Sequence, residues 1–502
     1  MRGGCSSGIA AALLFLPFAA LAAPPAGAPA LGINLFKVRP YSRELPFADL
    51  LQMRGGWRTG GSKAQVSLDS DGWPRALAPG QWVETQLMAG FGEHVPRGEL
   101  RASWEGEGTL EWLGASVRSD GPGRAHVVLD PRAARHGLRI RATSPTRPIR
   151  RIVLKLPDAG AAGAGAFNPR FLARWKGVRV VRFMDWGQTN DSPLRRWSER
   201  TLPDGPQGTE RGVAVEWMIE LGNRLNADPW LCIPHAADDA YVEAMAQLVK
   251  ARLAPGRRPW IEYSNEVWNG QFEQARYARG EGLRRQLAPR DGVAAQRFYA
   301  QRALEIFAIW ERVFGGEQRI VRVLAGQFGN ERGAREILGW QDAAKRADAY
   351  AIGAYFGLRH ASLSGAEIAA ADDARLAGLL EGAIDESRER LRGSVTIARS
   401  FGLPLVAYEG GQHLRDDPRI PGLSERLVAM NRSPAMKRLY QLALKQWREE
   451  GGATFVHFSS TSGYGENGSW GALEWWDQAT SPKYEALREA IDGKRAPLAG
   501  AE

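Results

Sequence analysis

The feature that most constrains the fold is the regular alternation of apolar, strand-like runs with amphipathic helices after residue 166. Parallel strands need such an order, because a crossover, usually a helix, must separate each strand from its parallel neighbour. One more apolar run lies far upstream, and together the runs predict the eight strands of a (β/α)8 TIM barrel. The expected strands are residues 31–36, 178–185, 228–235, 260–263, 319–327, 349–355, 403–409 and 453–459.

The alternation is absent between residues 58 and 158, where short runs with a period of two are separated by turn residues. This pattern is typical of an antiparallel β-sandwich. Because one apolar strand precedes it, we interpret it as an all-β domain inserted into the barrel. The expected organisation is a signal peptide at 1–22, a linker at 23–30, the first barrel strand and helix at 31–57, the inserted sandwich at 58–158 and the remainder of the barrel at 167–492.

Four tryptophans of the all-β region have two possible roles. Trp73, Trp82, Trp104 and Trp112 could stack on sugar rings, as in a carbohydrate-binding module, or fill the core of a small sandwich. The core role is favoured, since tryptophan is highly buried on average.

The first residues have the features of a secretory signal peptide: Arg2, an apolar run at 9–21 and small residues before Ala23. We therefore expect a secreted or periplasmic protein. The run is too short to span a bilayer, and no other stretch is long and apolar enough, so no membrane span is expected. Of the two cysteines, Cys5 would leave with the signal, so no intrachain disulfide is expected.

The net charge of +10 is scattered along the chain, mostly as arginine. A solvated basic surface is the simplest explanation, and attraction to an acidic polysaccharide or an anionic cell surface is the alternative. We expect no nucleic-acid partner, because no recognisable binding motif is present. The sequence also lacks metal-ligand spacing, a P-loop and a dinucleotide fingerprint, so neither metal nor cofactor is expected. A monomer is expected.

Two of the expected strands end in a glutamate. The run Trp260–Tyr263 leads to Asn265 and Glu266, and the run 403–408 leads to Glu409. Paired carboxyl groups are what glycoside hydrolysis requires: one protonates the leaving oxygen, and the other attacks the anomeric carbon or activates a water. The aromatic residues around the first pair, Trp260, Tyr263 and Trp268, are expected to surround Glu266 and to raise its pKa by desolvation.

The string Glu262-Tyr-Ser-Asn-Glu-Val-Trp-Asn269, with a second glutamate ending a later strand, resembles clan A of the retaining glycoside hydrolases. That clan has (β/α)8 barrels and includes cellulases, mannanases, xylanases and arabinofuranosidases. The resemblance implies that Glu266 is the acid/base, that Glu409 is the nucleophile and that Asn265 holds the sugar 2-hydroxyl. It extends over residues 31–57 and 167–492 at the level of strand order.

Further polar residues stand at expected strand ends: Arg182, His235, Gln327 and Tyr355. We expect all four to bind substrate, because active sites of this architecture lie at the carboxyl ends of the strands. The resemblance implies that Arg182 and Tyr355 contact the nucleophile. Arg182 would then keep Glu409 ionised while Glu266 stays protonated. The alternatives are a structural ion pair for Arg182, core positions for His235 and Tyr355, and a structural role for Gln327.

The segment 459–476 holds several aromatic residues among Gly and Ser, including Trp470, Trp475 and Trp476. Aromatic faces at the catalytic end suit stacking against pyranose rings. Clan A enzymes commonly place a tryptophan beneath the reacting sugar from this region, so the resemblance favours Trp470, although the eighth strand itself contains no tryptophan.

These features predict a secreted retaining glycoside hydrolase that cleaves O-glycosidic bonds of a polysaccharide or oligosaccharide by double displacement. The alternative is a non-catalytic carbohydrate-binding protein, associated with a cell wall or exopolysaccharide, in which the all-β region binds. The presence of both Glu266 and Glu409 favours the enzyme, because a pure binding protein does not need two such carboxylates.

Overall fold

The computed structural model describes residues 30–160, 165–358 and 363–493. The expected signal peptide and almost all of the linker lie outside the described residues. At the centre is a closed barrel of eight parallel strands, whose last strand pairs with its first. In barrel order they are β1 (Leu31–Asn34), β10 (Val180–Arg182), β11 (Asp228–Ile233), β12 (Trp260–Tyr263), β13 (Val321–Ala325), β14 (Ala349–Phe356), β15 (Leu405–Gln412) and β16 (Phe455–Phe458). The predicted (β/α)8 barrel is confirmed.

Barrel strands are covered on both faces, which explains their near-continuous apolar sequences. Every residue of β12, β13 and β15 is buried. Gly32 of β1 shows how closely the strands approach: a Cβ at this position would lie 2.8 Å from the Val180 carbonyl oxygen of β10. Several strands are shorter than predicted, among them β10 and β13, whereas β15 continues past Glu409 to Gln412.

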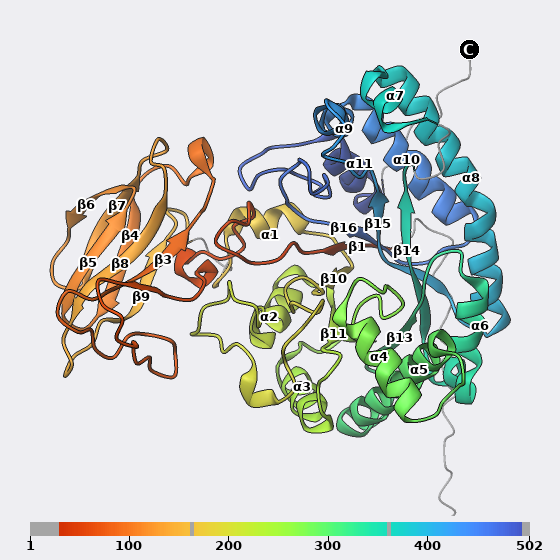
Figure 1. Cartoon of the computed structure of the whole chain (residues 1–502), viewed down its shortest axis with the longest axis horizontal. Helices are drawn as coiled ribbons and strands as arrows, with labels where there is room; N and C mark the ends of the chain where they lie inside the picture. The colour runs from red at the N-terminus through yellow and green to blue at the C-terminus, as the bar shows by residue number, and fades with distance from the viewer. Residues whose placement is uncertain (1–29, 161–164, 359–362, 494–502) are drawn as a thin grey trace, which may run out of the picture.

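The helices lie around the outside of the barrel (Figure 1). Asp238, Ser433 and Ser481 each accept a backbone N–H at the start of α3, α10 and α11, which stabilises the beginning of these helices. The α-helices are α1 (Pro169–Trp175), α2 (Val215–Leu225), α3 (Asp239–Arg252), α4 (Glu273–Arg284), α5 (Asp291–Phe314), α6 (Glu331–Gly339), α7 (Gly365–Ala370), α8 (Asp373–Ser400), α9 (Leu423–Arg432), α10 (Pro434–Glu449) and α11 (Pro482–Ile491). Among the described residues, no helix is long and apolar enough to cross a membrane.

Between β1 and β10 the chain forms two antiparallel sheets of four strands each, here called the all-β segment (residues 58–155). Sheet one has the order β2-β3-β8-β5 and sheet two the order β6-β7-β4-β9. The strands are β2 (Arg58–Gly60), β3 (Trp82–Leu87), β4 (Leu100–Glu105), β5 (Gly108–Leu113), β6 (Ala115–Ser119), β7 (Arg124–Leu129), β8 (His136–Thr143) and β9 (Arg150–Lys155). The all-β insertion is as predicted in fold class, and its exact boundaries stay a prediction.

The tryptophans of the all-β segment contribute to its packing. Trp73 and Trp112 are buried, and Trp104 is half-buried against the core. Trp82 is half-buried, and the guanidinium of Arg139 lies 4.5 Å from its ring centroid. These positions favour the core role over a row of exposed sugar-stacking faces.

The all-β segment lies beside the barrel, and the chain after β16 extends toward it (Figure 1). The ring of His94 stacks on Trp475 with centroids 3.9 Å apart, and its Nδ1 lies 2.9 Å from a carboxylate oxygen of Asp477. Trp476 donates its indole N–H to the His94 carbonyl oxygen at 2.7 Å. Trp475 and Trp476 therefore join the all-β segment to the barrel and do not offer free faces to a sugar.

Glu44 links the chain after β1 to α1 and to the chain after β16. Its buried carboxyl group accepts hydrogen bonds from Ser460 Oγ (2.5 Å), Thr461 Oγ1 (3.0 Å) and Trp175 Nε1 (3.3 Å). Burial raises the pKa of Glu44 to about 7, against the opposing effect of these hydrogen bonds. Burial likewise raises the pKa of Asp49 and of Asp185 to about 6.

We expect the protein to lose stability as the pH rises from about 5 to about 8. The folded state retains protons on these three carboxyl groups after the unfolded chain has released them, so unfolding becomes easier as the pH climbs through the window. Glu44 alone should contribute roughly 3 kcal/mol. The measurement is the melting temperature at pH 5 and pH 8 for the protein and for Glu44→Gln, whose dependence on pH should be flatter. An equal dependence in both proteins would contradict the role of Glu44.

Candidate active site

The centre of the site is Arg182, the last residue of β10, which is completely buried. Its Nε and Nη2 donate to the same carboxylate oxygen of Glu262 at 3.0 and 2.8 Å. Nη2 also donates to Asn265 Oδ1 at 2.8 Å. The other terminal nitrogen, Nη1, donates to Asn34 Oδ1 at 3.2 Å and to Glu409 Oε2 at 3.4 Å. One guanidinium thus connects β1, β12, β15 and the residues that follow β12.

Glu262 is the main partner of Arg182, and the sequence did not single it out as a site residue. Its carboxylate also accepts from Trp230 Nε1 at 2.8 Å and lies 3.4 Å from Cys232 Sγ. The available signal was its position, since a charged residue inside an otherwise apolar barrel strand must find a buried partner. Arg182 does contact Glu409, as expected, but Glu262 lies closer, at 2.8 Å against 3.4 Å.

Glu409 enters the site through an irregularity of β15. Ala407 lies opposite Ile352 and Glu409 opposite Gly353, so Tyr408 is an extra residue in the strand. Neighbouring residues of a regular strand point to opposite faces, whereas a bulge re-aims a side chain. The irregularity allows Tyr408 and Glu409 to reach the same site, although they are adjacent in sequence.

Tyr408 lies between the two candidate carboxylates. Its hydroxyl donates to Glu266 Oε1 at 3.0 Å, and the guanidinium of Arg182 lies 5.0 Å from its ring centroid. The other oxygen of Glu266 accepts from Asn269 Nδ2 at 2.9 Å. On the opposite carboxylate, the Tyr355 hydroxyl donates to Glu409 Oε1 at 3.0 Å. Each candidate carboxylate is therefore held by a tyrosine hydroxyl.

Of the three aromatic residues predicted to surround Glu266, two line a cavity together with it. Tyr263 donates its hydroxyl to the His235 carbonyl oxygen, and Trp260 stacks on Trp230. Both are strand residues whose orientation the alternation of β12 determines. Tyr263 and Trp268 both line this cavity, which has a volume of about 140 Å³.

The backbone after β12 is strained where the candidate residues lie. Ser264 (φ 59°) and Glu266 (φ 41°) both occupy the left-handed region, which is uncommon for residues other than glycine. Such conformations cost of order 1 kcal/mol each and persist where the surroundings fix them.

Asn265, between the two strained residues, is fixed by a buried amide network. Its Nδ2 donates to Asn190 Oδ1 at 3.0 Å, and its carbonyl oxygen accepts from Gln274 Nε2 at 2.8 Å. Gln274 Nε2 also donates to Asn190 at 2.7 Å. The sequence offered no signal for Asn190 or Gln274, because both lie in segments without a motif.

Burial raises the pKa of both Glu266 and Glu409. For Glu409 the negative charge of Glu266 adds to this effect, while Arg182 and the Tyr355 hydroxyl oppose it. The predicted division, with Glu409 ionised and Glu266 protonated, stays a prediction. Interacting groups titrate as a pair, and this pair retains a proton at a higher pH than isolated glutamates would.

Trp470 contacts Tyr355, the residue whose hydroxyl donates to the candidate nucleophile Glu409. The two ring centroids are 5.9 Å apart, and the indole also contacts His413 at 5.1 Å and Phe458 at 6.1 Å. Trp470 is half-buried, so part of its ring faces solvent at this end of the barrel. Of the three tryptophans in residues 459–476, it alone contacts a residue of the site.

Two predicted residues lie further out. Gln327 follows β13, accepts from Asn330 Nδ2 at 3.3 Å and lines the same cavity as Glu266. His235 is buried against Tyr277, with ring centroids 5.2 Å apart, and burial lowers its pKa. No hydrogen bond or ring contact joins His235 to Glu266 or Glu409 in the described part of the chain. A role in substrate binding stays a prediction for both residues.

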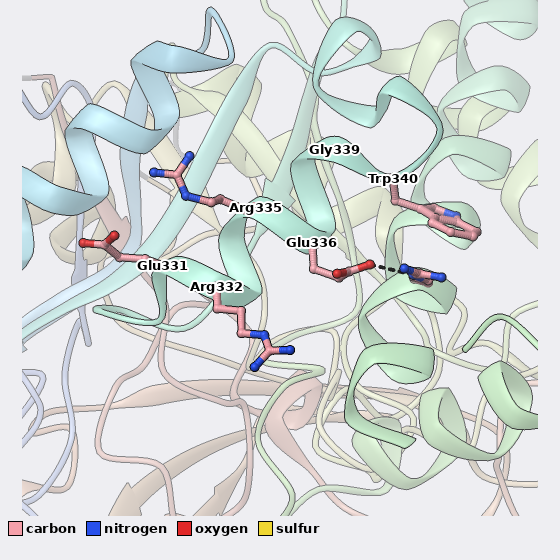
Figure 2. A pocket seen from close by; sticks show the side chains of 7 residues that line it. Glu331, Arg332, Arg335, Glu336, Gly339 and Trp340 are labelled. Carbon is pink, nitrogen blue, oxygen red and sulfur yellow. Dashed lines mark hydrogen bonds and ion pairs between the residues drawn. The ribbon is translucent and has the colours of Figure 1, made fainter. Parts of the chain in front are cut away.

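A larger hollow, of about 590 Å³, lies on the outer side of α6. Its residues do not converge on one point: Arg332 and Arg335 extend in different directions, and Glu336 accepts from Arg297 at 2.6 Å (Figure 2). It contains neither candidate carboxylate. Across the described ranges, no three His, Cys, Asp or Glu side chains gather as a metal site.

Replacing Glu262 by glutamine should destabilise the protein by about 3–5 kcal/mol, because Arg182 would lose the partner of its buried charge. The released guanidinium should also lower the pKa of Glu409. The measurements are the free energy of unfolding and the pH dependence of any activity. Glu216→Gln is a matched control, since Glu216 is buried and paired with Arg200 at 3.1 Å in α2. A pH dependence unchanged in Glu262→Gln would contradict the electrostatic link to Glu409.

The fold and the site together define a (β/α)8 barrel in which the buried Glu409 of β15 and the half-buried Glu266 after β12 lie near one buried arginine. No protein-family model matches the chain, and no curated protein does.

Solved structures similar in fold include three enzymes. A GH51 arabinofuranosidase from Xanthomonas axonopodis pv. citri is 12% identical with a TM-score of 0.46, over 66% of this chain and 67% of that one. A Bacteroidetes-affiliated GH5 cellulase is 11% identical with a TM-score of 0.41, over 69% and 88%. A Bacteroides ovatus GH5 xyloglucanase is 10% identical with a TM-score of 0.36, over 92% and 98%. The function of this chain is therefore inferred from its own site.

Proposed function

We propose that the protein is a retaining glycoside hydrolase that cleaves O-glycosidic bonds of a polysaccharide or oligosaccharide. The observation that carries the proposal is the pair Glu266 and Glu409, which come from segments far apart in sequence and are linked by two side chains. Tyr408 donates to Glu266, and Arg182 contacts both the Tyr408 ring and Glu409. The raised pKa of the pair supports acid catalysis near neutral pH.

In the first step, a carboxylate oxygen of Glu409 attacks the anomeric carbon while the bond to the leaving oxygen breaks. The proton of Glu266 goes to the leaving oxygen, so the first product departs neutral. The sugar stays bound to Glu409 as an ester. Arg182 and the Tyr355 hydroxyl hold Glu409 in position, at 3.4 and 3.0 Å.

In the second step, the ionised Glu266 removes a proton from a water as the water oxygen bonds to the anomeric carbon. The ester bond to Glu409 breaks, and the carboxylate is restored. Two displacements at one carbon return the anomeric centre to its original configuration.

Around these two groups, Trp470 is proposed as the stacking face for the reacting sugar, and Asn265 as the donor to its 2-hydroxyl. Asn265 has a second amide N–H besides the one given to Asn190. Gln327 lies on the side of Glu266, where the leaving group would be bound. Action on external glycans would fit the signal peptide expected at residues 1–22, and a secreted or periplasmic location is part of the proposal.

The experiment is to incubate the mature protein with a panel of plant and bacterial polysaccharides and to measure new reducing ends. Proton NMR of the first products should show the anomeric configuration of the substrate. Products of inverted configuration would contradict double displacement. Binding without any release of reducing ends would favour the non-catalytic carbohydrate-binding protein.

A further inference from the structure

Sheet two of the all-β segment carries a row of basic side chains across its exposed face. Lys155 of β9 lies opposite Arg101 of β4, Arg101 opposite His126 of β7, and His126 opposite Arg118 of β6. Directly opposed residues share one face of a sheet. At a strand spacing of about 4.8 Å, the row extends over roughly 14 Å.

The corresponding row of sheet one has a different charge pattern. Arg58 lies opposite Glu84, Glu84 opposite Arg139, and Arg139 opposite Glu111, so the signs alternate. Arg139 is ion-paired with both glutamates, at 2.5 and 3.3 Å. In sheet one, therefore, opposite charges face each other across neighbouring strands and Arg139 is neutralised, as expected because like charges directly opposite each other destabilise a sheet.

Sheet two neutralises only part of its charge. Glu99 pairs with Arg118 and His126, both at 3.2 Å, and Asp120 lies 3.4 Å from His126. Glu105 forms ion pairs with Arg150 at 3.1 Å and with Arg151 at 3.0 Å, so it does not neutralise the row.

Three exposed cations on this face remain without an ion pair among the described residues: Arg101, Arg124 and Lys155. Arg124 lies opposite Ser103, which is two residues beyond Arg101 in β4. Residues two apart in a strand point to the same face, so Arg124 lies on the same face as the row. The surplus of positive charge occupies the middle of the sheet and the edge strand β9, where the backbone of Lys155 forms an isolated antiparallel β-bridge with that of Asp49.

We propose that this basic face, defined by Arg101, Arg118, Arg124, His126 and Lys155, binds an acidic polysaccharide whose sugar carboxylates pair with the arginines. Guanidinium and carboxylate groups match in geometry, and a row of like charges is relieved by a polyanion lying across it. The choice of a glycan, and not another polyanion, rests on the proposed function of the attached barrel. The electrostatic complementarity itself does not depend on catalysis.

The test measures the retardation of the protein in native gels that contain polygalacturonate, a polymer of uronic acid, or a neutral glucan. Glu409→Gln is the background, so that the polymer is not cut. The test variant carries Arg101→Gln and Lys155→Gln in addition to the background substitution Glu409→Gln. The matched control adds Arg58→Gln and Arg332→Gln, which remove the same charge from exposed arginines of sheet one and of α6 that form no ion pair in the described ranges.

Polygalacturonate should retard the background protein and the control, and the test variant should bind roughly fivefold more weakly. The binding should weaken with added salt, because exposed charges are screened. Equal weakening of both variants would overturn the inference in favour of diffuse attraction by the net charge. Retention by anionic lipid vesicles but not by polygalacturonate would overturn it as well. Hydrolysis of a glycan without binding of polygalacturonate would contradict this inference alone, whereas binding without any hydrolysis would contradict only the proposed function.

Discussion

Replacing Glu409 by glutamine should reduce turnover on the order of 10⁴-fold or more, because the amide cannot form the ester with the anomeric carbon. The glutamine has nearly the same shape and can still accept from the Tyr355 hydroxyl, so the fold should be retained. The measurement is the initial rate of reducing-end release. Mass spectrometry of the protein treated with a slowly released fluorosugar should show an adduct that the variant lacks.

Glu216→Gln is again the control, since it removes a buried, paired carboxylate remote from the site. It should keep the rate and the adduct. An adduct mapped by peptide sequencing to any residue other than Glu409 would overturn the assignment of the nucleophile.

Replacing Glu266 by glutamine should slow hydrolysis of natural glycans by about 10²- to 10⁴-fold, because both the proton for the leaving oxygen and the base for water are lost. The two steps should respond differently to the substrate. An aryl glycoside with a leaving group of low pKa does not need protonation, so ester formation should remain fast and the glycosyl-enzyme should accumulate. The measurement is a burst of phenolate release followed by slow turnover.

Asn269→Ala provides a second variant at the same carboxyl group, since Asn269 Nδ2 donates to Glu266 at 2.9 Å. It should raise the pKa of Glu266 by removing a hydrogen bond that favours the charged form, without removing the acid. Its activity should therefore persist to a higher pH. If Glu266→Gln slows aryl and natural substrates by the same factor with no burst, Glu266 is not the acid/base.

Several features of the site were predictable because they follow from local patterns. An apolar run interrupted by a polar residue identifies a strand end in any parallel barrel, and Arg182, Asn265, Glu266, Tyr355 and Glu409 were found in this way. The roles of Asn265, Glu266 and Glu409 came from a resemblance carried by few residues, and they remain proposals.

Other features were not predictable because they depend on contacts between distant segments. Tyr408 reaches Glu266 only through the irregular register of β15 against β14. Trp475 has the same local surroundings in sequence as a sugar-stacking residue, yet His94 of the all-β segment, far away in the chain, covers it. The pKa of Glu266 likewise depends on residues distant in sequence, since burial raises it and Tyr408 and Arg182 lower it.

The sequence by itself determined the order of the barrel strands and the presence of an all-β region between the first two of them. Hydrophobic periodicity reports which residues are buried and in which local conformation, and these properties are encoded within a few neighbouring positions. Only the tertiary structure decided which buried charges pair, which aromatic rings remain accessible and which face of the all-β segment has unpaired cations. Those outcomes depend on the register and approach of segments separated by up to hundreds of residues, on which a local pattern carries no information.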